Sequence, residues 1–99
     1  MVDENLIHKA LSSSFRREIL QWLKTPEQHF AHGYLDLGHG VPVNAIHARS
    51  GLSQSNVSAH VATLVEAGLL VSTRMGQWMF LSRNEEVIRA FAAQISLHL

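Results

Sequence analysis

A chain of 99 residues can form one domain around a single core, and 46% hydrophobic with 16% charged residues is typical of a folded globular protein, not a disordered one. Because the sequence contains no cysteine, it excludes disulfides, thiolate metal sites and cysteine nucleophiles. Lys and Arg together number 8, as do Asp and Glu, and this neutrality argues against a polycation that coats nucleic acid by charge alone.

Neither a membrane span nor a secretory signal is visible in the sequence. No apolar run approaches the length that crosses a bilayer. The first ten residues, MVDENLIHKA, do not place a basic segment ahead of an apolar one. We therefore expect a cytoplasmic protein that does not bind a membrane.

Two amphipathic helices are predicted in the first quarter of the chain. Asp3 is a suitable N-cap for the first helix, whose apolar stripe contains Leu6, Ile7, Ala10 and Leu11. Serines at positions 12–14 interrupt it, because their hydroxyls compete for backbone groups and favour a cap. The second helix carries its own apolar stripe and ends before Pro26; the stripe contains Phe15, Ile19, Trp22 and Leu23.

The segment from Gln28 to Pro42 is the least regular part of the chain, with three glycines and three histidines. Its possible metal ligands are His29, His32, Asp36 and His39, which could in principle form an imidazole–carboxylate site. A His-x-x-His pair in a glycine-containing loop is a weak signal, and we favour a polar loop whose histidines face water. Residues 41–43 are expected to form a short extended segment.

A compact pair of helices is predicted next. Residues 43–50 form the first, which Gly51 closes in the left-handed C′ position. Ser53 is a good N-cap for the second, which runs to about Ala67 and buries Val57, Val61, Leu64 and Val65. Helix, tight glycine turn and helix together predict a helix-turn-helix.

A β-hairpin and a final helix complete the predicted fold. Residues 69–73 and 78–81 form two strands around a four-residue turn at 74–77 that contains a glycine. The last helix starts at Asn84, and its apolar residues, Val87, Ile88, Phe91 and Ile95, require a partner surface. The sequence thus predicts a mainly α domain with a small β-hairpin over residues 1–99, a winged helix-turn-helix of about five helices and a two-stranded wing.

The outward side of the helix after Ser53 carries small, uncharged, hydrogen-bonding residues, and its first charged residue is Glu66. Small side chains let a helix enter a major groove, where Gln and Asn can pair with adenine and Ser can reach bases or phosphates. The helix N-terminus adds free N–H groups for a phosphate. A capped helix with an ordinary polar face is the alternative, and the hairpin favours DNA binding. The candidate DNA-binding residues on this helix are Gln54, Ser55, Asn56, Ser58, His60 and Thr63.

Local charge supports this hypothesis. Between residues 43 and 83 the basic side chains are Arg49, Arg74 and Arg83, and the only acidic one is Glu66, which leaves a net charge of 3 − 1 = +2. Arg74 and Gln77 at the hairpin tip are candidates for contact with phosphate or a minor groove. An ordinary solvated turn is the alternative for Arg74.

Two segments, LSQSNVSAHVATLVEAGLL and VSTRMGQWMFLS, resemble the recognition helix and wing of the winged-helix repressors of the ArsR/SmtB family. The matching residues are Ser53, Ser55, Val57, Ser58, His60, Ala67, Gly68, Leu69, Arg74 and Gly76, while Val61 stands where the family usually has Leu. The segment SSSFRREILQWL is similar to the family's second helix, with Arg16 or Arg17, Ile19, Leu20 and Leu23 in place. The resemblance covers nearly the whole chain except residues 28–42.

The resemblance implies a homodimer in which the first and last helices pair across a two-fold axis and present two reading heads to double-stranded DNA.

Many family members release DNA when a metal or thiol ligand binds. The family's Cys-x-Cys motif falls on Pro42 and Asn44, and its last-helix site retains only Glu85 and His98 as possible ligands. We therefore expect no metal site and no cofactor. The sequence leaves open whether the loop cluster, the Glu85/His98 pair or an unidentified small molecule provides an inducer site.

Enzymatic function is not expected, because the sequence has no nucleophile elbow, no paired-carboxylate cleft and no nucleotide-binding fingerprint. The remaining hypotheses are a sequence-specific transcriptional repressor and a winged-helix module for protein–protein assembly that does not contact DNA. An interaction module more often exposes large apolar residues on its second helix, so the uncharged polar face favours the repressor.

Overall fold

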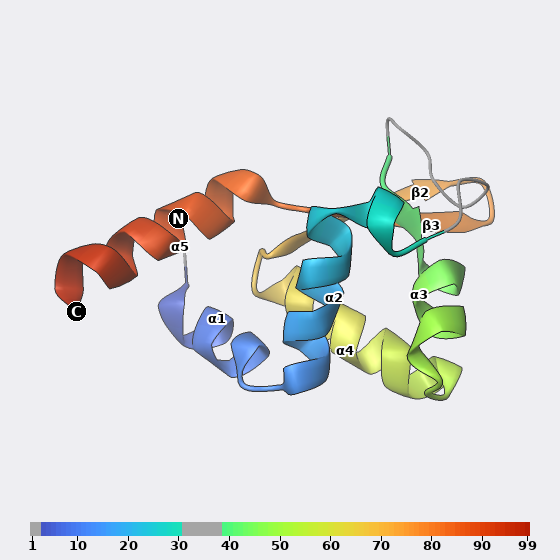
Figure 1. Cartoon of the computed structure of the whole chain (residues 1–99), viewed down its shortest axis with the longest axis horizontal. Coiled ribbons are helices and arrows are strands. Elements are labelled where there is room, and N and C mark those ends of the chain that lie inside the picture. The colour runs from blue at the N-terminus through green and yellow to red at the C-terminus, as the bar shows by residue number, and fades with distance from the viewer. Residues whose placement is uncertain (1–2, 31–38) are drawn as a thin grey trace.

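The computed structural model describes residues 3–30 and 39–99, and within them it contains five α-helices and a three-stranded sheet (Figure 1). The helices are α1 (Glu4–Leu11), α2 (Ser14–Lys24), α3 (Val43–Ser50), α4 (Gln54–Glu66) and α5 (Glu85–His98), and a 3-10 turn, η1, spans Pro26–Gln28. The strands are β1 (Val41–Pro42), β2 (Leu70–Met75) and β3 (Trp78–Arg83). None of the helices in these ranges has the length and apolarity needed to cross a membrane.

Side-chain caps start four of the helices. The side chains of Asp3, Ser13, Ser53 and Asn84 each accept a hydrogen bond from the backbone N–H three residues further along the chain. Gly51 closes α3 with φ +73°, a left-handed conformation that glycine adopts without strain. The predicted caps at Asp3, Ser53 and Asn84 and the glycine end of α3 are thus confirmed.

The sheet is larger than the predicted two-stranded wing. Its strand order is β1-β3-β2, with both pairs antiparallel, because Val41 pairs with Leu81 and Pro42 with Phe80. The hairpin turn contains two residues, Gly76 and Gln77, not the predicted four, and Arg74 lies within β2 opposite Met79. Gly76 has φ +62°, as the first central residue of a type II′ turn requires, and this turn matches the twist of the paired strands.

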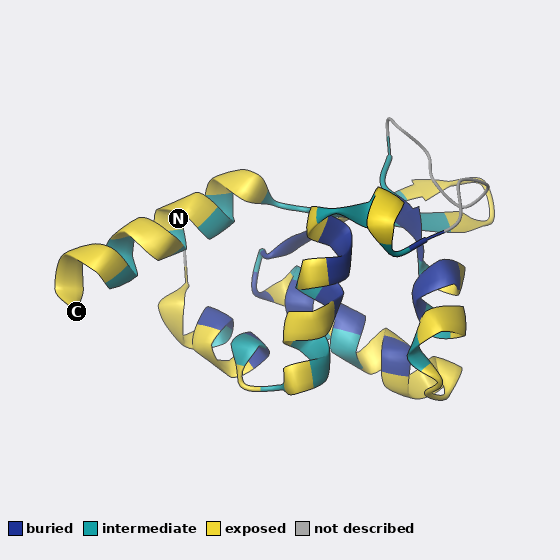
Figure 2. Ribbon diagram, viewed as in Figure 1, coloured by how far each residue is buried: buried dark blue, intermediate teal, exposed yellow. Residues whose placement is uncertain are grey.

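The core receives side chains from every helix and strand except α5 (Figure 2). Ile7, Ile19 and Leu64 are completely buried where α1, α2 and α4 pack together. Ile46 from α3 and Leu81 from β3 are also completely buried, so the helix pair and the sheet share one cluster. Burial of these side chains holds α4 in place from behind.

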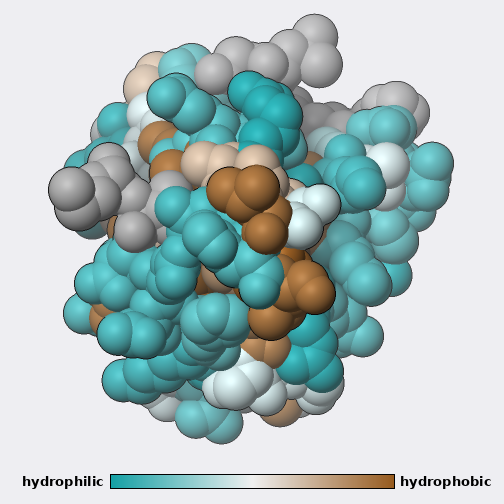
Figure 3. All heavy atoms as spheres, turned by 90° about the vertical axis from the view of Figure 1, so that its left-hand side faces the viewer, coloured by the Kyte–Doolittle hydropathy of each residue, from teal (hydrophilic) through white to brown (hydrophobic). Residues whose placement is uncertain are grey.

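Helix α5 contains no buried residue and extends away from the body of the protein (Figures 1 and 2). Val87, Ile88 and Phe91 pack partly against the core, and the Phe91 ring meets His8 of α1 edge-on at 5.3 Å. Near the end of the chain, Leu97 is 78% exposed and Leu99 97% exposed. From the side where α5 ends and α1 begins, apolar side chains gather in the middle of a mostly polar face (Figure 3).

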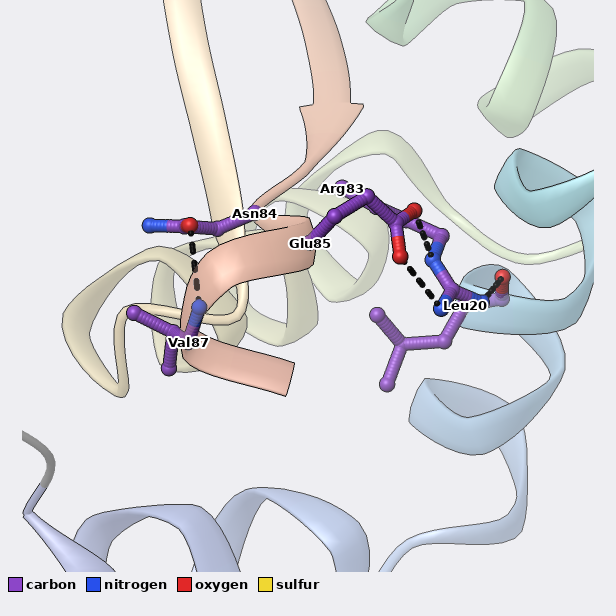
Figure 4. Close-up of polar contacts among 5 residues, drawn as sticks. All are labelled: Leu20, Arg83, Asn84, Glu85 and Val87. Atoms are coloured by element: carbon purple, nitrogen blue, oxygen red, sulfur yellow. Dashed lines mark hydrogen bonds and ion pairs between the residues drawn. The ribbon is translucent and has the colours of Figure 1, made fainter. Parts of the chain in front are cut away.

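Polar contacts around Arg83 attach the start of α5 to the body (Figure 4). The Arg83 guanidinium donates to both carboxylate oxygens of Glu85, at 2.8 and 3.1 Å, and to the Leu20 carbonyl of α2 at 3.4 Å. The side chain of Arg83 is 12% exposed and that of Glu85 51% exposed, so the guanidinium is shielded while the carboxylate stays at the surface. The direction in which α5 leaves the sheet is therefore anchored to α2.

Replacement of Gly40 by alanine should destabilise the fold more than the same change at Gly51. A Cβ on Gly40, whose φ is +104°, would lie 2.1 Å from the Leu81 carbonyl oxygen and would push β1 off β3. A Cβ on Gly51 meets nothing within 4 Å, so Gly51→Ala carries only the conformational penalty. We expect Gly40→Ala to lower the free energy of unfolding by about 3 kcal/mol and Gly51→Ala by about 1–2 kcal/mol. Equal losses in urea denaturation would show that β1 moves aside without cost.

Candidate nucleic-acid interface

Helix α4 turns one side to the core and the other to solvent. Val57 and Leu64 are completely buried and Val61 is 8% exposed, and these three residues form the inner stripe. The outer side is exposed and consists of Gln54, Ser55, Asn56, Ser58, Ala59 and Ala62, which includes four of the predicted DNA-binding residues. Before Glu66, the longest side chain on this outer face is that of Gln54. The helix backbone is therefore accessible to a large partner.

Several of these polar side chains have unused hydrogen-bonding capacity. The side chains of Gln54 and Ser58 form no hydrogen bond with any part of the chain that the structure describes, and the Asn56 amide group is equally unpaired there. Ser55 contacts only the cap, with its Oγ 3.3 Å from Ser53 Oγ. Thr63 differs, because its hydroxyl donates to the Ala59 carbonyl at 3.1 Å within the helix. The unpaired groups are therefore concentrated in the first turns of α4.

A groove of about 620 Å³ separates α4 from the hairpin. Gln54 and Ser58 line it from α4, and Arg74, Gln77 and Trp78 line it from β2, the turn and β3. Both predicted hairpin residues thus lie on the same groove as the first part of α4. Trp78 is 51% exposed, and no pattern in the sequence indicates that it is part of the site.

The three arginines between residues 43 and 83 have different contacts. Arg49 donates to the His29 carbonyl at 3.0 Å, and its guanidinium lies 4.9 Å from the centre of the Trp22 ring. Arg83 is paired with Glu85, as described above. Arg74 makes neither a hydrogen bond nor an ion pair with residues 3–30 or 39–99. The net charge of +2 counted for residues 43–83 therefore overstates the positive charge that is available to a ligand. Arg74 is the main source of the charge that remains available.

His60 lies on the flank of α4 that faces α2, at the edge of the outer side and not at its centre. Its ring packs edge-on against Phe15 with centroids 5.2 Å apart, and its Nδ1 is 3.0 Å from Nη1 of Arg16. In the sequence, Arg16 is recognisable only as a residue that matches the family's second helix. The two residues are 44 positions apart, so no local pattern predicts their contact.

The candidate metal ligands are dispersed in the described part of the chain. His29 contacts Arg49, and the His39 ring lies 5.9 Å from that of Phe80. His32 and Asp36 lie outside the described residues. Glu85 and His98 occupy opposite ends of α5, about 20 Å apart at the rise of an α-helix, so they cannot bind one ion within a single chain. Residues 3–30 and 39–99 contain no group of three or more potential metal-binding side chains.

Comparisons with known proteins agree on the fold and on the class of protein. The family model for the IclR helix-turn-helix domain matches residues 31–74, which include α3, α4 and most of β2. The chain is 40% identical over 88 residues to a protein of Bacillus subtilis (strain 168) that is named uncharacterized HTH-type transcriptional regulator YbzH. The aligned residues cover 87% of this chain and 88% of that protein. The structure is similar to that of HlyU from Vibrio cholerae N16961, with TM-score 0.64 and 25% identity over 96% of this chain and 90% of that chain.

Arginines with different contacts should affect stability differently. Arg49→Gln removes the Trp22 contact and the hydrogen bond to the His29 carbonyl, so we expect the free energy of unfolding to fall by about 1 kcal/mol. Arg74→Gln serves as the matched control, because that side chain has no partner to lose among the described residues, and its effect should stay within about 0.5 kcal/mol. Urea denaturation followed by tryptophan fluorescence measures both. A larger loss for Arg74→Gln would mean that the hairpin arginine is a structural residue.

Proposed function

The chain belongs to the helix-turn-helix transcriptional regulators, and we propose that it acts within this family as a homodimeric repressor of the ArsR type that binds a pseudo-palindromic operator. The observation that carries the proposal is the uncharged outer face of α4, from which Gln54 and Ser58 line the same groove as Arg74. None of these three side chains has a hydrogen bond or ion pair with the described residues. This arrangement separates side chains that can read bases from a cation that can bind phosphate.

The ArsR assignment rests on motif residues that have consistent roles in the fold. Ser53 caps α4, Val57 is buried behind it, and Gly76 forms the hairpin turn. The IclR helix-turn-helix model matches residues 31–74, whereas the resemblance to the ArsR family covers nearly the whole chain except residues 28–42. We therefore favour the ArsR type for the chain as a whole.

The homodimer is supported by the apolar surface that α5 leaves uncovered. Ile95 does not belong to the set of residues that pack against the core, and Leu97 beyond it is 78% exposed. A second copy that covers this face would bury the apolar side chains. Two copies would place two α4 helices on half-sites about one DNA turn, roughly 34 Å, apart.

The inducer remains a separate part of the proposal. The family's thiolate chemistry is not available, because the chain has no cysteine. The described residues hold no metal-binding cluster, and Glu85 is occupied by Arg83. We propose that release from DNA responds to an unidentified small molecule, with a metal bound through residues of two subunits as the alternative.

An interaction module without DNA binding is the second candidate, and exposed apolar residues on the hairpin favour it. Val71 is 43% exposed, Met75 44% and Trp78 51%. Met75 and Trp78 are paired across the strands next to the turn, so they form one apolar area. The polar face of α4 supports DNA binding instead, and the experiment that follows distinguishes the two.

Substitutions on α4 should lower specific binding more than general binding. Duplexes that the protein selects from a random-sequence pool serve as the operator, and a scrambled duplex serves as the control. Ser55→Ala, Asn56→Ala and Ser58→Ala should each lower discrimination by about 1–3 kcal/mol, because base-edge contacts carry specificity. Arg74→Ala should weaken binding to both duplexes and reduce the salt slope by about one.

Equal losses on both duplexes for the α4 variants would argue against a reading role. Failure of the parent protein to select any duplex would favour the interaction module. Fluorescence anisotropy at several salt concentrations gives both quantities.

The proposed dimer is tested at the far end of α5. Ile95→Glu should produce monomers and abolish tight operator binding, because the two half-sites would no longer be linked. Phe91→Glu should have the same effect, but Phe91 also packs against the core, so Ile95 gives the cleaner test. Ala93→Glu adds the same charge on the exposed side of α5 and should leave the dimer intact. A parent protein that sediments as a monomer at micromolar concentration would contradict the dimer.

A further inference from the structure

The Arg16 guanidinium sits at the junction of three helices. Its Nε donates to the Ala10 carbonyl at 2.7 Å and its Nη2 to the Lys9 carbonyl at 3.0 Å, both at the C-terminal end of α1. Its Nη1 lies 3.0 Å from Nδ1 of His60 on α4. A cation is favoured at this position because carbonyls at a helix C-terminus carry partial negative charge. The side chain is thereby held in one orientation toward His60.

The chemistry of the pair determines where the His60 proton lies. A guanidinium has only donors and stays charged, so His60 Nδ1 must accept the hydrogen bond from Arg16. An imidazole that accepts at Nδ1 carries its hydrogen on Nε2 in the neutral form. The Phe15 ring, edge-on at 5.2 Å, restricts the rotation of the same imidazole.

The Nε2 atom of His60 is unpaired in the described residues and is not fully buried. It has no hydrogen bond with the described residues, in which Gln94 Oε1 is the sole buried side-chain oxygen or nitrogen without a partner. His60 Nε2 is therefore in contact with solvent. It lies one turn after Asn56, on the edge of the outer face of α4 and not at its centre. Backbone phosphates line the edges of a groove, whereas base edges lie at its floor.

We propose that Arg16 is a positioning residue that fixes His60 in the Nε2–H tautomer, so that Nε2 donates a hydrogen bond to a DNA backbone phosphate. This inference rests on the proposed DNA binding. Arg16 itself does not touch DNA; it determines which ring nitrogen of His60 presents a hydrogen.

The first test uses nitrogen NMR of the free protein, with Arg17 as the matched control. Arg17 also donates to a carbonyl at the end of α1, that of Leu11, but has no contact with His60. Arg16→Gln and Arg17→Gln remove the same charge. Long-range nitrogen–proton spectra at about pH 8, above the ordinary titration range of histidine, should show the Nε2–H tautomer in the parent and in Arg17→Gln, and a mixture in Arg16→Gln. Identical His60 spectra in all three proteins would overturn the positioning role.

The second test compares two amides at position 60. Gln places its amide N–H near the position of Nε2 and keeps the outward donor, whereas the shorter Asn reaches only the position of Nδ1. His60→Asn should weaken binding about tenfold on both the selected and the scrambled duplex, and His60→Gln should weaken it less than about threefold. A loss confined to the selected duplex would overturn the phosphate contact, because it would indicate a base. Equal losses for Asn and Gln would overturn the donor role of Nε2.

The third test measures DNA affinity and protein stability together in the Arg16→Gln and Arg17→Gln variants. Arg16→Gln should weaken binding to both duplexes about fivefold more than Arg17→Gln does, at a matched fraction of folded protein from urea denaturation. Rescue by His60→Gln in the Arg16→Gln background would support the tautomer, because glutamine has no tautomer to fix. No rescue would overturn it. If the parent protein selects no duplex, the proposed function and the phosphate contact both fail, while the NMR result still decides the tautomer.

Discussion

The burial of one side of α4 is the constraint on which the rest of the structure depends. Val57 and Leu64 are completely buried, and they pack behind the helix together with residues from α1 and α2. Because a helix has a fixed angular repeat, the burial of this stripe determines which residues face outward. Those residues, including Gln54 and Ser55, are uncharged and short. The core therefore determines both the position of α4 and the chemistry that it presents.

Local features of the fold were predictable from the sequence, because each depends on residues within a few positions. The caps at Asp3, Ser53 and Asn84 and the glycine at the end of α3 are examples, since a capping side chain bonds to a backbone N–H three residues away. The β1–β3 pairing was not predictable. It joins Val41 to Leu81, and a two-residue strand has too short a pattern to indicate its partner.

In the candidate site too, local features were predictable from the sequence and long-range contacts were not. The sequence pattern predicted Gln54, Ser55, Asn56 and Ser58 as DNA-binding residues of α4, and the structure has all four exposed. Sequence counting could not tell which arginines remain unpaired, because Arg49 meets Trp22 and His29 from another part of the chain. The same holds for the contact between Arg16 and His60, which joins residues 44 positions apart. A charge in a sequence becomes available to a ligand only after the fold has assigned its partners.

Arg16 also connects the two surfaces that the proposed repressor needs. It binds carbonyls of α1, and α1 meets α5 through the contact between His8 and Phe91. On its other side it reaches His60 on α4. A dimer formed through α1 and α5 would hold the same carbonyls that orient Arg16, so dimerisation and the orientation of His60 would share one chain of ring contacts and hydrogen bonds. Coupling between two sites requires such a contiguous arrangement or a change in the ensemble, and here Arg16 adds a polar connection to the direct packing of α1, α2 and α4.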